Sequence, residues 1–182
     1  MPNPMMPDYM FRTFDEITPD FLREIGVRAV LADIDNTLAP YEQPEPDEQI
    51  CAWLAELAEA GVQTAFLSNN HGPRVELFNK TLERPCRYNA HKPLARRGKE
   101  LMRSLGGDES CTAMMGDQVF TDVLVARAMG VRAILVPPIK DKTDALTRFK
   151  RFLERGVLRR YHKRHPDAPD VREGSTLTKE YV

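Results

Sequence analysis

Residues 27–38 read VRAVLADIDNTL, a short apolar run that passes directly into Asp33, Asp35 and Thr37. A nearly continuous apolar run with β-branched residues is typical of a strand buried on both faces of a sheet. Two carboxylates at the end of such a strand are costly to desolvate unless a positive group lies between them. Mg²⁺ is a suitable group, because it prefers oxygen ligands and accompanies phosphate. The other interpretation is a pair of turn-forming acids that cap a loop.

The chain around this stretch alternates between strand-like and helical patterns as far as Pro138. The predicted strands are residues 27–34, 62–68, 86–88, 111–116 and 132–136, and the predicted helices are residues 47–61, 73–83, 93–105 and 119–129. Parallel strands need crossover connections, so this order predicts an α/β fold, a parallel sheet with helices on both faces. Ligands of such sheets bind beyond the carboxyl ends of the strands.

Three further predicted strand ends carry polar groups. Ser68-Asn69 ends the second strand, His91-Lys92-Pro93 opens a helix, and the strand 111–116 leads into Asp117 and Asp122. Each has an ordinary explanation when it is taken alone: a helix cap, a surface lysine or a pair of capping acids. Together, an acid pair, a hydroxyl, an amine and a second acid pair at successive strand ends predict one convergent pocket.

The composition of the chain limits the class of protein. Its 182 residues allow one domain with appendages, and 42% hydrophobic with 29% charged residues exclude a disordered or low-complexity chain. Three widely separated cysteines form neither a disulfide framework nor a zinc site. The N-terminus has no signal-peptide pattern, and no apolar stretch reaches the length of a membrane span. We therefore expect a cytoplasmic protein, at most peripheral at the inner face of a membrane.

The polar strand ends resemble the four motifs of the haloacid-dehalogenase-like (HAD) phosphohydrolases. The matching residues are Asp33-x-Asp35-x-Thr37, Ser68, Lys92 and Gly116-Asp117-x4-Asp122. The sequence of residues 17–38, together with the SNN and HKP segments downstream, is similar to the corresponding sequences of the YqeG-type phosphatases of HAD subfamily IIIA. The resemblance covers about residues 10–140. It implies a Rossmann-like, HAD-like fold and hydrolysis of a phosphomonoester through an aspartyl-phosphate.

The resemblance also implies a role for each matched residue. Asp33 would be the nucleophile, and Asp35 would be the general acid and base. The implied phosphate-binding residues are Ser68, Asn69 and Lys92. The implied Mg²⁺ ligands are Asp33, the backbone carbonyl of Asp35, Asp117 and, through water or from a second layer, Asp122.

The intervals between the motifs are short. Asp35 to Ser68 spans 33 positions and Ser68 to Lys92 spans 24, and ordinary secondary structure fills both. Neither interval can hold an inserted cap domain, so we expect an open site that accepts phosphate on a large body. The predicted organisation is an N-terminal segment packed on the core (1–25), a catalytic domain without a cap (26–139), a basic helix (140–165) and a mobile tail (166–182).

The basic segment stands out from a chain whose net charge is −1. Residues 140–165 carry ten Lys and Arg against three Asp and Glu. Their apolar residues recur at three- and four-residue steps: Leu146, Phe149, Phe152, Leu153, Val157, Leu158 and Tyr161. This pattern predicts an amphipathic helix that either lies on a membrane surface or packs its apolar stripe on the domain. A nucleic-acid partner is disfavoured, because no binding motif accompanies the charge.

The resemblance extends to phosphatases of phosphatidylglycerophosphate, an anionic lipid precursor, which would place the chain in phospholipid metabolism. An open site and a basic face are compatible with that substrate. Two alternatives stay open at this point. One is a soluble phosphatase of the same chemistry that acts on sugar or nucleotide phosphates. The other is an inactive binding module, disfavoured because every catalytic position holds a competent side chain.

Overall fold

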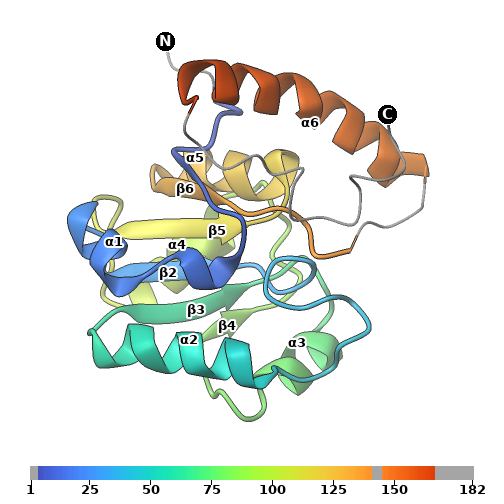
Figure 1. Cartoon of the computed structure of the whole chain (residues 1–182). Coiled ribbons are helices and arrows are strands. Elements are labelled where there is room, and N and C mark those ends of the chain that lie inside the picture. Colours follow the sequence, from blue (N-terminus) through green and yellow to red (C-terminus); the bar gives the residue numbers. More distant parts are fainter. Residues whose placement is uncertain (1–3, 141–144, 167–182) are drawn as a thin grey trace.

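One six-stranded parallel sheet forms the centre of the protein (Figure 1). The computed structural model describes residues 4–140 and 145–166, with side chains of the last helix described from Glu154 onward. The strands are β1 (Tyr9–Met10), β2 (Ala29–Ala32), β3 (Gln63–Leu67), β4 (Cys86–Arg87), β5 (Thr112–Gly116) and β6 (Arg132–Leu135). Their order is β1-β6-β5-β2-β3-β4, and every pairing is parallel. The predicted α/β architecture is confirmed, and β2 lies in its middle.

Helices cover both faces of this sheet, as the sequence predicts. Alternate residues of β2 face opposite ways, because side chains alternate along a strand. Val30 and Ala32 pack in a core with α1 (Pro19–Glu24), α2 (Glu48–Glu59) and α3 (Gly72–Asn79). Leu31 packs in a second core with α4 (Arg96–Ser104), α5 (Leu124–Met129) and α6 (Ala145–Arg164). Two apolar layers thus hold the strand that carries Asp33.

The N-terminal segment contains elements that the sequence pattern does not reveal. Besides α1 it forms β1 and a 3₁₀ turn, η1 (Phe14–Glu16). The backbone N–H of Asp8 donates to Ala133 O at 2.9 Å, which places β1 beside β6. A strand of two residues is too short to show a period of two. The indole N–H of Trp53 on α2 donates to Ile17 O at 3.0 Å, and this bond fastens the segment to the first core.

Two predicted helices begin differently from the prediction. The helix expected from Pro93 begins at Arg96, because residues 91–94 form a turn in which Leu94 N–H donates to His91 O at 2.9 Å. The helix expected over 119–129 begins with a π-helical segment, η2 (Val119–Val123), before α5. A π-helical turn inside an α-helix is frequent at functional sites.

The last helix packs on the domain through the part whose side chains are described. Val157 and Tyr161 are buried in the second core, and Tyr161 Oη lies 3.3 Å from Asp8 O. The packing interpretation therefore holds for this half of α6. The expectation of a mobile tail falls almost entirely outside the described residues. No helix in the described part of the chain is long and apolar enough to cross a membrane.

Candidate active site

The polar residues at the strand ends meet at one edge of the sheet. Asp33 directly follows β2, Ser68 directly follows β3, and Asp117 directly follows β5. Since parallel strands end at the same edge, these groups are neighbours although they lie far apart in sequence. Between Asp35 and Lys92, a range described without a gap, the chain forms only loops, α2, β3, α3 and β4. No inserted domain covers the edge in that range.

Lys92 lies at the centre of this edge. Its Nζ is 2.8 Å from Asp33 Oδ1 and 2.7 Å from Asp122 Oδ1, and its side chain is only 2% exposed. Burial alone would lower the pKa of Lys92, but the Asp122 and Asp33 carboxylates reverse this effect and raise it above the usual range. The ammonium is therefore charged at neutral pH, and it links Asp33, which follows β2, to Asp122, which follows β5.

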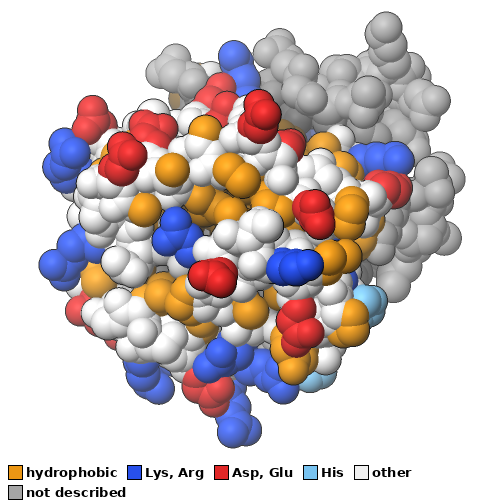
Figure 2. Space-filling view, turned by 90° about the horizontal axis from the view of Figure 1, so that it is seen from below, with side chains coloured by type: hydrophobic (Ala, Val, Ile, Leu, Met, Phe, Trp, Pro, Cys, Tyr) orange, Lys and Arg blue, Asp and Glu red, His pale blue; other side chains and the backbone are white. Residues whose placement is uncertain are grey.

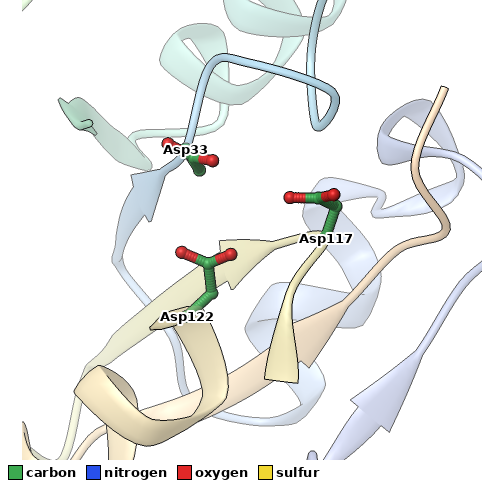
Figure 3. Close-up of side chains that lie close together, drawn as sticks. All are labelled: Asp33, Asp117 and Asp122. Carbon is green, nitrogen blue, oxygen red and sulfur yellow. The ribbon is translucent and has the colours of Figure 1, made fainter. Parts of the chain in front are cut away.

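Three buried carboxylates cluster at this edge, and two of them, Asp33 and Asp122, contact the Lys92 ammonium. Figure 3 shows Asp33 from the end of β2, Asp117 from the end of β5 and Asp122 from η2 pointing toward a shared space. One oxygen of each lies within 4.8 Å of the others. Burial raises the pKa of Asp33, the Lys92 ammonium opposes that shift, and the Asp122 and Asp117 carboxylates add to it. Three buried acids with one ammonium leave an excess of negative charge, which suits a divalent cation with oxygen ligands.

Asp122 is held in place by the backbone around it. Its Oδ2 accepts the Gln118 N–H at 3.0 Å while Oδ1 faces Lys92. A Cβ built on Gly116 would collide with the Asp122 carboxylate. Glycine at the end of β5 is thus needed for the close approach of Asp122, which the sequence pattern anticipates.

Asp35 occupies a different environment from Asp33. Its Oδ2 accepts the Asn70 side-chain N–H at 2.9 Å, and its Oδ1 lies 3.1 Å from an Arg74 guanidinium nitrogen. The Arg74 guanidinium in turn donates to Pro44 O at 3.2 Å and lies over the ring of Phe78. The Asp35 carboxylate is therefore outside the acidic cluster and is held by one hydrogen bond and one ion pair of its own.

Ser68 and Asn69 are hydrogen-bonded to residues of both environments, Ser68 to Asn70 and Asn69 to Lys92. The Ser68 hydroxyl oxygen is buried and accepts the Asn70 N–H at 3.0 Å. Asn69 uses its side chain on the main chain of Lys92: its Oδ1 accepts the Lys92 N–H at 2.7 Å, and its Nδ2 donates to Lys92 O at 3.2 Å. Asn69, predicted to bind phosphate, thus holds the segment that presents Lys92.

Arg74 and Tyr41 also belong to this site, although the sequence pattern does not indicate them. Arg74 lies on α3, and no local pattern distinguishes it from a surface arginine. Tyr41, in the loop after β2, is half-buried; burial raises its pKa, and the carboxylates of Asp35 and Asp33 raise it further. The Tyr41 phenol therefore stays neutral and lies within electrostatic range of both acids. An aromatic residue shortly after the first motif is the signal that could have suggested it.

Comparisons with known proteins now identify the family. The sequence profile of the family described as "Mitochondrial PGP phosphatase" matches residues 1–140. The chain belongs to this family. The "Probable phosphatase YqeG" of Bacillus subtilis (strain 168) is 33% identical over 153 residues, which cover 84% of this chain and 89% of the relative. The resemblance to YqeG-type HAD phosphatases is confirmed, and the chain is a phosphatase that acts on a phosphate ester.

Solved structures share the fold at low sequence identity. The cobalt-bound deoxy-D-mannose-octulosonate 8-phosphate phosphatase of Haemophilus influenzae aligns with a TM-score of 0.51 and 16% identity, over 72% of this chain and 90% of that one. An uncharacterized protein of Listeria monocytogenes serotype 4b aligns with the same TM-score and identity, over 65% and 85%. These likenesses confirm the Rossmann-like fold of the HAD phosphatases.

Proposed function

We propose that the protein is a Mg²⁺-dependent phosphomonoester hydrolase that forms an aspartyl-phosphate on Asp33. One observation carries the proposal: two carboxylates at one strand end lie in different environments. Asp33 joins Lys92 and two further acids, whereas Asp35 is held apart by Asn70 and Arg74. Carboxylates in distinct environments can take distinct roles, one as nucleophile and the other as acid and base.

In the first step a carboxylate oxygen of Asp33 attacks phosphorus, and the bond from phosphorus to the leaving oxygen breaks. Asp35, protonated at that stage, gives its proton to this leaving oxygen. The Lys92 ammonium and the Ser68 hydroxyl stabilise charge on the phosphoryl oxygens. A bound Mg²⁺, held by Asp33, Asp117, the carbonyl of Asp35 and indirectly Asp122, would neutralise part of the same charge.

In the second step Asp35 takes a proton from water, and the water oxygen attacks phosphorus. The bond between phosphorus and the Asp33 oxygen breaks, inorganic phosphate leaves, and the Asp33 carboxylate is restored. Asp35 is again protonated and ready for the next leaving group. Every proton in this cycle passes through Asp35, whose carboxylate the Asn70 amide and the Arg74 guanidinium hold in place.

We further propose that the substrate is phosphatidylglycerophosphate at a membrane surface. The family's description supports this substrate, and the absence of an inserted domain between Asp35 and Lys92 is compatible with a large one. A cavity of about 630 Å³ adjoins the segment that presents Lys92, and its lining includes Arg87, Arg96 and Arg97. Tyr88 and Leu94, which also line it, are 40% and 67% exposed. Basic and apolar groups together suit an anionic lipid.

Two parts of the surface are compatible with a contact to an anionic membrane: the face drawn in Figure 2 and the outer side of α6. Figure 2 shows the molecule from below, with hydrophobic side chains exposed among both Lys or Arg and Asp or Glu side chains. On α6, whose inner side carries buried Val157 and Tyr161, the residues Arg155, Arg159 and Lys163 are exposed. A docked helix with basic residues on its outer side can contact anionic headgroups.

The deciding experiment compares phosphate release from two substrates under the same conditions. The substrates are phosphatidylglycerophosphate in phosphatidylglycerol vesicles and a soluble aryl phosphate. Arg97→Glu should lower turnover of the lipid about 10-fold, equivalent to about 1.4 kcal/mol, and leave the aryl phosphate within 2-fold, because the reversed charge would repel the anionic lipid. Arg103→Glu, the same charge change near the other end of α4, is the matched control.

The outer face of α6 has its own test. Reversal of Arg155, Arg159 and Lys163 to Glu should weaken sedimentation with phosphatidylglycerol vesicles, and added salt should weaken the wild-type binding as well. Vesicle binding that survives the triple reversal would remove α6 from the membrane contact. Fast turnover of sugar phosphates with none of the lipid would favour the soluble alternative.

A further inference from the structure

A carboxylate from the last helix reaches the catalytic edge. Glu154 Oε1 on α6 accepts the backbone N–H of Val119 at 2.9 Å. Val119 is the first residue of η2, and the preceding residue, Gln118, provides no side-chain cap. The first N–H groups of a helix have no partner inside the helix and need one from elsewhere. Glu154 provides this partner from a position 35 residues further along the chain.

The segment that Glu154 holds carries two of the three clustered acids. Asp117 lies two residues before Val119, and Asp122 lies three residues after it. Two consecutive amides of this segment are bound by carboxylates: Gln118 N–H by Asp122, and Val119 N–H by Glu154. The turn between the two acids is therefore fixed from both sides, once from within the segment and once from α6.

Glu154 is in an unusual place for its residue type. It is only 3% exposed, whereas its neighbour Arg155 is exposed. A buried carboxylate is costly unless hydrogen bonds compensate for the lost hydration. Val157 and Tyr161, three and seven residues further on, are buried as well, so Glu154 belongs to the helix face that packs on the domain. Packing alone would favour an apolar residue at this position.

We propose that Glu154 is a positioning residue for the metal-binding segment. Its bond to Val119 N–H fixes the turn between Asp117 and Asp122 and thereby sets the affinity of the site for a divalent cation. This inference rests on the proposed function, in which those acids bind Mg²⁺. It also gives α6 a role in the chemistry without any contact between α6 and the substrate.

The test measures Mg²⁺ binding to the full-length protein by calorimetry, without substrate. Glu154→Ala should weaken binding roughly 10-fold to 100-fold, the usual range for the loss of a group that orients metal ligands. Glu154→Gln keeps an acceptor oxygen at the same reach and should stay within about 3-fold of the wild type. Glu154→Asp keeps the charge but is one methylene shorter, so it should bind Mg²⁺ as weakly as the alanine variant.

The order of the Mg²⁺ affinities of these variants distinguishes the effect of the hydrogen bond from the effect of the charge. If the aspartate variant binds Mg²⁺ better than the glutamine variant, the charge matters and the positioning role is wrong. This comparison still decides if Glu154→Ala fails to fold. Tyr161→Phe, which removes another polar contact of α6, is the control and should leave Mg²⁺ affinity unchanged. Failure of the wild type to bind any divalent cation would instead contradict the proposed function, and wild-type affinity in a folded Glu154→Ala would contradict this inference alone.

Discussion

Asp33 and Asp35 are two residues apart, yet they lie in opposite halves of the catalytic edge. The Asp33 half contains Lys92, Asp117 and Asp122, an ammonium among buried carboxylates. The Asp35 half contains Asn70, which donates a hydrogen bond to Asp35, and Arg74, whose guanidinium forms an ion pair with it. In the second half the Arg74 guanidinium balances the charge of Asp35, whereas the first half has surplus negative charge that a cation would balance.

Removal of the nucleophile should have the largest effect. Asp33→Asn keeps the shape of the side chain but cannot form an acyl phosphate, so we expect kcat to fall by roughly 10³-fold or more. Without metal, the variant should still fold and should unfold close to the wild-type temperature, because Lys92 keeps its ion pair with Asp122 at 2.7 Å. Steady-state kinetics and thermal unfolding measure the two effects. Activity above a few per cent of the wild type contradicts the assigned role.

Chelation should act on the Asp33 half alone. Excess chelator should abolish turnover, Mg²⁺ should restore it, and Ca²⁺ should support it poorly because it prefers larger and looser coordination. Metal titration of variants sharpens the contrast between the halves. Asp117→Asn should bind Mg²⁺ at least 10-fold more weakly, whereas Asp35→Asn should bind it as the wild type does, since Asp35 would contribute only its backbone carbonyl. An equal loss of Mg²⁺ affinity in both variants would show that the two halves form one metal site.

Removal of the proton-transfer group should have the next largest effect. Asp35→Asn should lower kcat by about 10²- to 10⁴-fold, the usual contribution of general acid and base catalysis. The loss should be greater for an alkyl phosphate than for an aryl phosphate, whose leaving oxygen needs less help from a proton. Kinetics with the two esters side by side give the ratio. The same loss for both esters would show that Asp35 does not protonate the leaving group.

Arg74 should have the smallest effect of the four. Arg74→Ala removes the guanidinium 3.1 Å from Asp35 Oδ1 but leaves the bond from Asn70. We expect kcat to fall about 10-fold to 100-fold through misplacement of the carboxylate, with Mg²⁺ affinity unchanged. Arg74→Lys should recover part of the activity. A loss of Mg²⁺ affinity in Arg74→Ala would show that the arginine belongs to the other half of the site.

The two halves also differ in how well the sequence predicts them. Asp33, Lys92 and Asp117 follow strands whose patterns are local, so their meeting at one edge follows from the parallel order. Of the two partners of Asp35, Asn70 also follows a strand, but Arg74 could not be predicted in this way because it lies on a helix, α3. Its reach to Asp35 depends on how α3 packs.

The same limit applies to contacts between distant segments. Glu154 is an acidic residue in a predominantly basic segment, and nothing in its local sequence indicates a partner. It reaches Val119 because α6 packs on η2. Strand β1 consists of two residues and exists because β6 offers it a free edge. Tertiary contacts of this kind produce no periodic pattern in the sequence. The buried strands and the polar residues that follow them do produce a recognisable pattern.

Chemical trapping of the phosphorylated carboxylate tests whether Asp33 is the nucleophile. The wild-type enzyme is mixed with substrate and Mg²⁺, quenched in acid within one turnover, and reduced with borohydride, which converts an aspartyl-phosphate to homoserine. Peptide mass spectrometry then locates the modified residue. If Asp33 is the nucleophile, homoserine should appear at position 33, and none should appear in Asp33→Asn or in enzyme without substrate. Homoserine at position 35 or 117, or no modified carboxylate in a quenched enzyme that is turning over, would contradict it.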